Sequence, residues 1–265
     1  MPVIDCHCHI YPAKIADRAV EGVGNFYNIH MDACGGTSQA LIADSAPAPI
    51  THHVVHSVAT RPEQVRSINN FIAQECAANP HLIGFMTLHQ DMEDPLAEIE
   101  RACAMGLVGV KLHPDTQRVN MDDARLMRIY EAIEGRLPLI MHCGDYRYDF
   151  SHPRRMRKIL DTFPNLVVNA AHFGGWSIFD VAVEYMEDAH CFMDVSSSMK
   201  FLGNRRTTEL IQLYGTDRIM FGSDFPMWNP ADEYQRFTSL PFSPAEFENM
   251  TWHNAEKFLG RSISD

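Results

Sequence analysis

The stretch VIDCHCH at residues 3–9 predicts the first strand of the fold. It is short, begins with apolar residues and ends in polar ones, as expected of a β-strand that enters a buried sheet. Successive side chains of a strand point to opposite faces, so His7 and His9 share one face while Cys6 and Cys8 share the other. The stretch therefore presents two histidines on the same side of its carboxyl end.

Seven further segments repeat this design along the chain, each a short apolar run that ends in polar residues. Longer amphipathic stretches separate them, and this alternation is typical of β-α-β units with a parallel sheet. The predicted strands are Val3–His9, His53–Ala59, Leu82–Leu88, Leu107–His113, Leu137–His142, Leu166–His172, Cys191–Val195 and Arg218–Ser223. Eight strand-helix units predict a (β/α)₈ TIM barrel, which we expect to form a single domain over residues 1–265.

The predicted helices carry their own start and stop signals. Several begin at Pro or Asp, and Gly106, Gly135 and Gly215 follow three of them, where a left-handed residue is usually needed. The expected helices are Pro62–Ala78, Pro95–Met105, Asp122–Glu134, Pro153–Phe163, Ile178–Tyr185, Thr207–Tyr214 and Pro244–Leu259. The Gly- and Pro-rich stretch 22–49 departs from this spacing. We expect an elaborated first loop there, with short helical stretches, one of them capped by Thr37, lying over the barrel mouth.

Composition narrows the class of protein. The chain has 265 residues, of which 46% are hydrophobic, and its formal net charge is -12. That charge argues against nucleic acids and anionic membranes as partners, and favours a small-molecule substrate. No signal peptide or run long enough to span a bilayer is evident, so we expect a cytoplasmic protein. The oligomeric state is not encoded in any pattern we recognise, and a homodimer stays open.

Polar residues at the ends of the predicted strands give the strongest functional signal. In a parallel barrel the carboxyl ends of all strands open onto one face, so residues far apart in sequence converge there. Each of these residues follows an apolar run that contains almost no other charge. They are His7, His9, Lys111, His113, His142, His172 and Asp224. We therefore expect one polar site at the barrel mouth.

Several of these residues suit a metal ion. Because His7 and His9 are two positions apart on a strand, both imidazoles can reach one ion at about 2.0 to 2.1 Å. The carboxylate of Asp224 needs a partner at that depth, and a metal or its water supplies one. Glycine-containing turns follow His142 and His172, and such turns let the backbone approach a ligand closely.

Lys111 has three interpretations, because an ammonium inside a strand is rarely buried without a partner. It binds a substrate carboxylate, it is carboxylated and bridges two metals, or it pairs with Asp5 or another acid below the site. His113 lies on the same face of the strand, farther toward the loop, where it can contact substrate. The crowding of His52, His53 and His56 in the second strand we interpret as incidental, since adjacent residues point to opposite faces.

At this point the chain resembles the amidohydrolase superfamily, in the amidohydrolase-2 branch that includes aminocarboxymuconate-semialdehyde decarboxylase and related lactone hydrolases. The motifs that carry the resemblance are IDCHCH at 4–9, GVKLHP at 109–114, AHFGG at 171–175, FGSDFP at 221–226 and NAEKFL at 254–259. The resemblance implies a distorted (β/α)₈ barrel with metal at the strand ends. It implies one divalent ion, usually zinc, bound by His7, His9, His142 and Asp224, with His172 contacting the metal's water or the substrate.

Other branches of the superfamily hold two metals with a carboxylated lysine from strand four and both later histidines. This chain has all of those residue types, so Lys111 leaves a second ion open, and Mn²⁺ or another divalent ion remains an alternative to Zn²⁺. We expect a hydrolase in which Asp224 takes the proton from a metal-activated water that attacks a C–N or lactone bond. His172 would stabilise the oxyanion or share the proton transfer.

Two other functions stay open. The same residues could catalyse non-oxidative decarboxylation of an unsaturated or aromatic acid, with His172 or Asp224 as the proton donor to carbon. In both reactions Lys111 could hold a substrate carboxylate. A non-catalytic metal-binding protein is the third alternative, and it would require the loss of one ligand. All of the ligand positions are occupied by suitable residues.

Overall fold

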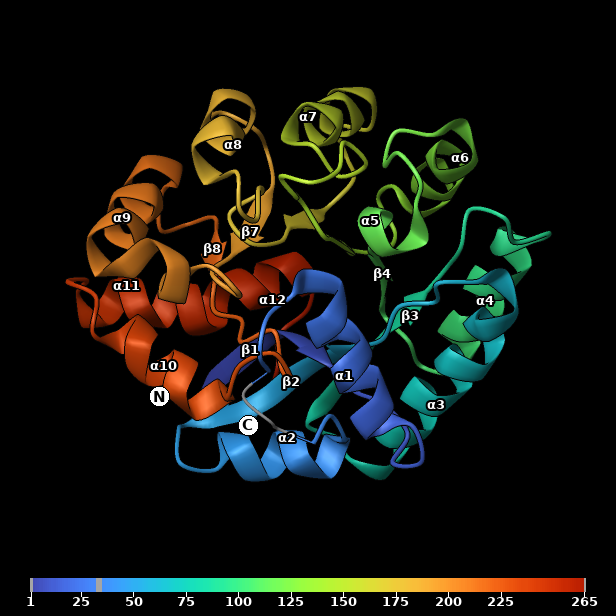
Figure 1. Ribbon diagram of the computed structural model, residues 1–265, viewed down its shortest axis with the longest axis horizontal. Helices are drawn as coiled ribbons and strands as arrows, with labels where there is room; N and C mark the ends of the chain where they lie inside the picture. Colours follow the sequence, from blue (N-terminus) through green and yellow to red (C-terminus); the bar gives the residue numbers. More distant parts are fainter. Residues whose placement is uncertain (1, 32–34, 265) are drawn as a thin grey trace.

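The computed structural model describes residues 2–31 and 35–264, and Figure 1 shows how their helices surround a central sheet. Over the described residues, eight parallel strands pair in the order β1 to β8. They are β1 Val3–His9, β2 Ile50–His56, β3 Leu82–Thr87, β4 Gly109–Leu112, β5 Leu139–Met141, β6 Val168–Ala170, β7 Phe192–Asp194 and β8 Ile219–Met220. This arrangement confirms the predicted (β/α)₈ barrel.

The first and last strands meet through backbone hydrogen bonds, which nearly close the barrel. The amide of Cys6 donates to the carbonyl of Phe221 at 3.0 Å, and the amide of Asp224 donates to the carbonyl of His7 at 2.8 Å. This contact brings the carboxyl end of β1 beside the segment that follows β8. It is the reason that residues more than 200 positions apart can share one site.

Most strands end earlier than predicted, so the polar residues follow the strands instead of ending them. His172 and Asp224 have φ values of 59° and 60°, in the left-handed region. Extended pairing cannot continue through such residues, because the backbone turns there. The second strand is also displaced, to Ile50–His56 from the predicted His53–Ala59. Its first residue pairs with Val3 of β1, and this pairing sets where the strand begins.

The helices agree with most of the expected segments. They are α1 Ala16–Tyr27, α2 Ser38–Ser45, α3 Val65–Ala78, α4 Pro95–Ala104, α5 Pro114–Gln117, α6 Ala124–Ile133, α7 Pro153–Thr162, α8 Phe179–Met186, α9 Met199–Tyr214, α10 Pro230–Thr238, α11 Pro244–Glu248 and α12 Asn254–Leu259, with short turns of 3₁₀ helix at Pro62–Gln64 and π-helix at Asn249–His253. The predicted helix 244–259 is thus divided in three. The glycines expected after three helices all have positive φ.

The elaborated first loop contains more helix than expected. Thr37 caps α2 as predicted, with its side chain accepting from the amide of Ala40 at 3.1 Å. The helix α1 was not predicted, because Gly22 and Gly24 lower the helix propensity of its sequence. In Figure 1 α1 crosses the barrel in front of β1 and β2, and its residues line the same cavity as His7 and His9 of β1. Residues 32–34 of this loop lie outside the described residues.

The two cysteines of β1 belong to different buried clusters. Cys8 packs in the larger one with the residues between strands and helices, whereas Cys6 packs in the smaller one with Ile4 and Ile140. The pairing of β1 with β2 shifts register between Asp5 and Cys8, which breaks the strict alternation expected for this strand. The prediction that both cysteines share one face was therefore wrong. Among the described helices, none is both long and apolar enough to cross a membrane.

Candidate active site

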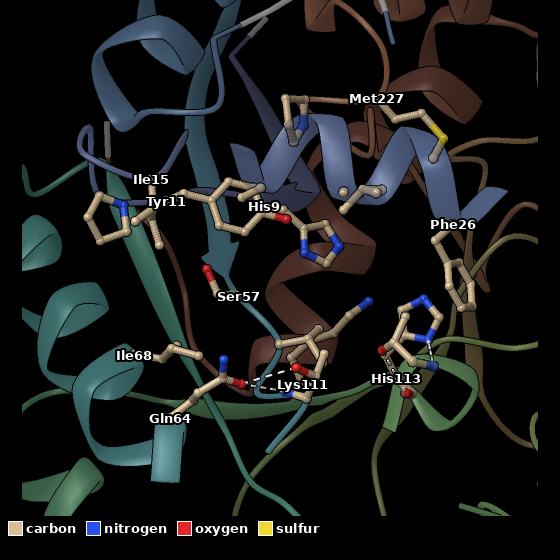
Figure 2. Close-up of a pocket in the computed structure, with 18 of the residues that line it drawn as sticks. His9, Tyr11, Ile15, Phe26, Ser57, Gln64, Ile68, Lys111, His113 and Met227 are labelled. Atoms are coloured by element: carbon tan, nitrogen blue, oxygen red, sulfur yellow. Dashed lines mark hydrogen bonds between the residues drawn. The ribbon is translucent and has the colours of Figure 1, made fainter. Parts of the chain in front are cut away.

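A cavity of about 880 Å³ opens at the carboxyl ends of the strands. All of the predicted site residues line it, namely His7, His9, Lys111, His113, His142, His172 and Asp224. Figure 2 shows His9 and Lys111 pointing into the same space, with Phe26 and Met227 at one side of it. The convergence expected from the strand ends is therefore present in the structure.

The carboxylate of Asp224 lies between the two histidines of β1. Its Oδ1 is 3.4 Å from Nε2 of His7 and 3.5 Å from Nε2 of His9. Ligands that bind one ion at about 2.05 Å are roughly 3.3 Å apart at a tetrahedral angle, so these separations suit shared coordination. The hydroxyl of Ser197 donates to the other oxygen of Asp224, which fixes the carboxylate in this orientation.

Asp194, at the end of β7, holds the imidazole of His7 from behind. Its Oδ2 accepts from Nδ1 of His7 at 2.9 Å, and both side chains are fully buried. Burial alone would raise the pKa of Asp194, but His7, with His172 and Ser196, outweighs burial and holds this pKa far below its usual range. Since Nδ1 carries the proton, Nε2 presents a lone pair to the cavity. Carboxylates commonly orient metal-binding histidines in this way.

The sequence did not single out Asp194, and it named Asp5 as a candidate partner of Lys111. The structure gives Asp5 a different role. Oδ1 of Asp5 accepts backbone amides, from His7 at 3.2 Å and from Ser223 at 2.9 Å. Burial raises its pKa to about 6. Asp5 therefore ties β1 to the segment after β8 and does not contact an imidazole ring in these hydrogen bonds.

Lys111 is buried in β4 and its amine contacts the site. Nζ is 2.8 Å from Nε2 of His7, so the ammonium donates to the lone pair described above. Burial lowers the pKa of Lys111 to about 8, against the opposing effect of Asp224 and Asp194. A depressed pKa makes the neutral amine accessible, and the neutral amine is the form that can be carboxylated or bind a metal.

His142 and His172 form a pair on the opposite side of the mouth. Nε2 of His142 donates to the carbonyl of Gly144 at 3.0 Å, and Nδ1 of His172 donates to the carbonyl of Ser196 at 2.9 Å. Burial lowers the pKa of His172 to about 4 and that of His142 well below its usual value, so both rings are neutral. A neutral imidazole has one N–H. Nδ1 of His142 and Nε2 of His172 therefore face each other, 3.1 Å apart, with lone pairs only.

The two facing lone pairs, on Nδ1 of His142 and Nε2 of His172, are a second feature that suits a cation. Two unprotonated nitrogens at 3.1 Å repel each other, and an ion bound by one or both of them removes the repulsion. The donor set of the mouth, with imidazoles and one carboxylate, is the set that zinc and similar divalent ions prefer. The residues present therefore fit the metal that the sequence motifs implied.

His113 contacts a residue of α1 that the sequence did not reveal. Its Nδ1 accepts from the amide of Thr116, and its Nε2 donates to the hydroxyl oxygen of Tyr27 at 2.6 Å. Because the tyrosine oxygen accepts here, its own hydrogen is left to donate to a molecule in the cavity, which Tyr27 lines. The ring of Tyr27 lies 4.8 Å from the ring of Trp176, and this contact helps to hold Tyr27 in place.

Arg147 fastens α1 to the loop after β5. Its guanidinium donates to the carbonyl of Phe26 at 2.5 Å and to Asp145 at 2.6 Å. It also lies over the rings of Phe26 and Tyr27, at 4.8 and 5.4 Å from their centroids. These contacts fix the carboxyl end of α1, and with it the hydroxyl of Tyr27, above the site.

His56, at the end of β2, also belongs to the site region, contrary to the expectation that the histidines of this strand are incidental. Its ligand nitrogens and those of His7 and His9 lie within 4.8 Å of one another. His53, on the other hand, lies near Asp5 and Cys8. Three positions along a strand separate opposite faces, so treating the histidines of this strand as one cluster concealed the difference.

Comparisons with known proteins agree with this arrangement. A family model described as amidohydrolase matches residues 4–261. A search of curated proteins found no match. Among solved structures, an uncharacterised TIM-barrel protein of Bordetella bronchiseptica is 20% identical with a TM-score of 0.75, over 98% of this chain and 99% of that one.

Two further structures of the same fold carry functional names. A dihydroxybenzoic acid decarboxylase of Polaromonas sp. JS666, with bound manganese and the inhibitor 2-nitroresorcinol, is 17% identical with a TM-score of 0.73, over 98% of this chain and 97% of that one. A candidate 2-pyrone-4,6-dicarboxylic acid hydrolase of Acinetobacter baumannii, with citric acid bound, is 15% identical with a TM-score of 0.70, over 98% and 100%. At these identities the structures show a shared fold. Because the family model spans nearly the whole chain, the protein belongs to the amidohydrolase family, in its amidohydrolase-2 branch.

Proposed function

We propose that the protein is a metal-dependent hydrolase that acts on a C–N bond or a lactone or ester of a small molecule. The observation that carries this proposal is the position of Asp224, whose carboxylate lies 3.4 and 3.5 Å from two histidine nitrogens at the base of the cavity. A carboxylate held there can both face an ion and accept a proton from water. Family membership supports a metal-dependent enzyme of this kind.

The residues that would hold the ion are His7, His9, His142 and Asp224. We propose one Zn²⁺, with Mn²⁺ as the alternative that the manganese in a structural neighbour supports. When bound, the ion would lower the pKa of water toward about 7 and polarise a substrate carbonyl. A second ion would need carboxylation of Lys111. The low pKa of its buried amine supports that option.

The protein's own groups would handle the proton and the substrate. Asp224, held by Ser197, accepts a proton from the attacking water and returns it to the leaving group. Nε2 of His172 carries a lone pair at the mouth, so this neutral ring can also accept a proton from the water and return it to the leaving group. Water is excluded on one side by α1, which carries Phe26 and Tyr27 over the cavity.

We propose a substrate that bears a carboxylate. Lys111 supplies a buried positive charge inside the cavity, His113 lines it, and Tyr27 supplies an O–H donor from α1. These groups suit an anionic oxygen better than a neutral apolar molecule. The formal net charge of -12 argues further against nucleic acid or an anionic membrane as the bound species.

Decarboxylation of an unsaturated or aromatic acid is the second candidate. The aromatic side chains that line the cavity favour it, namely Tyr11, Phe26, Tyr27 and Phe71. The dihydroxybenzoic acid decarboxylase among the neighbours favours it as well. In that reaction His172 or Asp224 would deliver a proton to the carbon that loses CO₂.

One assay separates these reactions. The metal-loaded protein is incubated with lactones, amides and unsaturated or aromatic carboxylic acids in ¹⁸O-labelled water. Hydrolysis predicts ¹⁸O in the product carboxylate and no CO₂. Release of CO₂ from an acid, without solvent oxygen in the other product, would replace the hydrolase assignment by the decarboxylase one.

A further inference from the structure

The side chain of His56 lies at the carboxyl end of β2, directly beside the metal-binding segment of β1. The two strands are parallel, and His9 and His56 are register partners. The amide of Ile10 donates to the carbonyl of His56 at 3.0 Å, so the two strand ends are locked at the same height. His56 is therefore at the level of the barrel mouth and not below it.

The ring of His56 points toward both histidines of β1. Its centroid is 4.4 Å from that of His9 and 5.0 Å from that of His7, with near edge-on geometry in both cases. The nitrogens of the three rings come within 4.8 Å of one another. Two donors bound to one ion at about 2.0 to 2.1 Å are separated by roughly 3 to 4 Å, so a small rotation of the rings brings all three onto one ion.

Neither nitrogen of His56 has a hydrogen-bond partner among the described residues, although the side chain is 0% exposed. A buried polar group without a partner is costly, and most such groups in native proteins are satisfied. The neighbouring amine of Lys111 contacts Nε2 of His7 but makes no hydrogen bond with either nitrogen of His56. The cavity lining includes Ser57 but not His56, so a substrate in the cavity is not its natural partner.

We propose that His56 is an additional imidazole ligand of the divalent ion, on the side of His7 and His9. Coordination supplies the partner that the ring lacks, and it uses a donor already aimed at the other two. It also makes the ion site depend on β2, in addition to the segments that the family motifs mark. This inference rests on the proposed metal-dependent function, since it assumes that the protein binds an ion at His7 and His9.

The test is the affinity of the metal-free protein for Co²⁺, measured by competition with a chelator, together with the visible absorption of the bound Co²⁺. His56→Gln is expected to weaken Co²⁺ binding at least about tenfold and to change the visible spectrum, as loss of a direct ligand should. His53→Gln is the matched control. It removes a buried histidine of the same strand whose Nδ1 also lacks a partner, and it should leave both readouts unchanged.

A second variant answers the case in which His56→Gln does not fold. His56→Cys keeps a metal-binding group at the position, and a thiolate bound to Co²⁺ adds a sulfur-to-metal absorption band that the wild type lacks. That band supports the inference. Its absence from a folded, Co²⁺-loaded His56→Cys protein overturns it.

The remaining outcomes are equally decisive. An unchanged affinity and spectrum in His56→Gln overturns the inference, and so does an equal loss in His53→Gln, because that would reflect general damage to β2. If the wild type binds no Co²⁺ at all, the proposed function fails first. If the wild type binds Co²⁺ and turns over substrate while His56→Gln binds it equally well, only the role of His56 fails.

Discussion

The two sides of the barrel mouth hold their imidazoles in different ways. On one side is the β1–β2 group, made of His7, His9 and His56, and on the other is the β5–β6 pair, made of His142 and His172. The β1–β2 group is anchored by a side chain, since Asp194 holds His7. The β5–β6 pair is anchored by backbone carbonyls. The amine of Lys111 and the carboxylate of Asp224 also lie at Nε2 of His7, whereas the β5–β6 pair has lone pairs that face each other.

This difference indicates how the two sides respond to change. A carbonyl anchor cannot be removed by a single substitution, so the β5–β6 pair keeps its geometry in most variants. The β1–β2 group depends on individual carboxylates and on Lys111, and each of these can be replaced. We therefore expect the chemistry of the site to be most sensitive to substitutions on the β1–β2 side.

The largest effect is expected for Asp224→Asn. The amide cannot accept a proton from water, and it weakens the link to His7 and His9, so kcat/KM should fall about 10²- to 10⁴-fold. Activity is measured on the best substrate of the screen at saturating metal. Asp232→Asn, an exposed position on α10, is the control and should behave as the wild type. Loss of less than about threefold in Asp224→Asn would remove this carboxylate from the mechanism.

Asp194→Asn should have the next largest effect, because it removes the charge that fixes the proton on Nδ1 of His7. Such anchors contribute about 10- to 100-fold to metal affinity in comparable sites. Competition with a chelator measures the metal affinity of both proteins. The variant should bind the ion more weakly because the orientation of His7, in the β1–β2 group, is no longer fixed. Equal metal affinity in Asp194→Asn and the wild type would show that the β1–β2 group does not depend on Asp194 as its anchor.

Tyr27→Phe should have a smaller effect, and on substrate instead of metal. It removes the O–H donor and the acceptor of His113 but keeps the ring that packs on Trp176. One hydrogen bond to an anionic group accounts for about a tenfold change in kcat/KM. Metal affinity should stay at the wild-type value. A loss of metal in this variant would mean that α1 supports the ion site as well as the substrate.

The fold was largely predictable because its signals are local. Apolar runs with Pro and Gly at helix ends identify the strands and most helices, and the order of parallel strands in a barrel follows from their order in sequence. The helix α1 was missed because its local propensity is weak. Its apolar side chains line the cavity with those of α3, so tertiary contacts decide its length.

The site was predictable only where one residue could be judged by its own position. All of the predicted site residues line the cavity. Asp194 was missed because its partner, His7, is 187 positions away, and an acid inside a short strand gives no sign of that contact. His56 was missed because it was grouped with two neighbours that face other surroundings. Contacts between residues far apart in the sequence decide both cases, and local sequence patterns do not reveal such contacts.

The smallest expected effect concerns the stability contributed by His53, which lies on the opposite face of β2 from His56. Burial lowers the pKa of His53 to about 3, whereas the unfolded chain takes up this proton near pH 6.5. Between these values the unfolded state binds more protons, so the contribution of His53 to stability is fully present above pH 6.5 and is lost as the pH falls toward 3.

His53→Gln should therefore flatten the fall in unfolding free energy between pH 6.5 and about 4, measured by urea denaturation of the metal-free protein. The same substitution should leave the affinity for Co²⁺ unchanged, because His53 faces Asp5 and Cys8 and not the ion site. A pH dependence identical to that of the wild type would show that His53 is protonated or hydrated in the folded state. His53 and His56 would then differ in their surroundings less than their positions on opposite faces of β2 require.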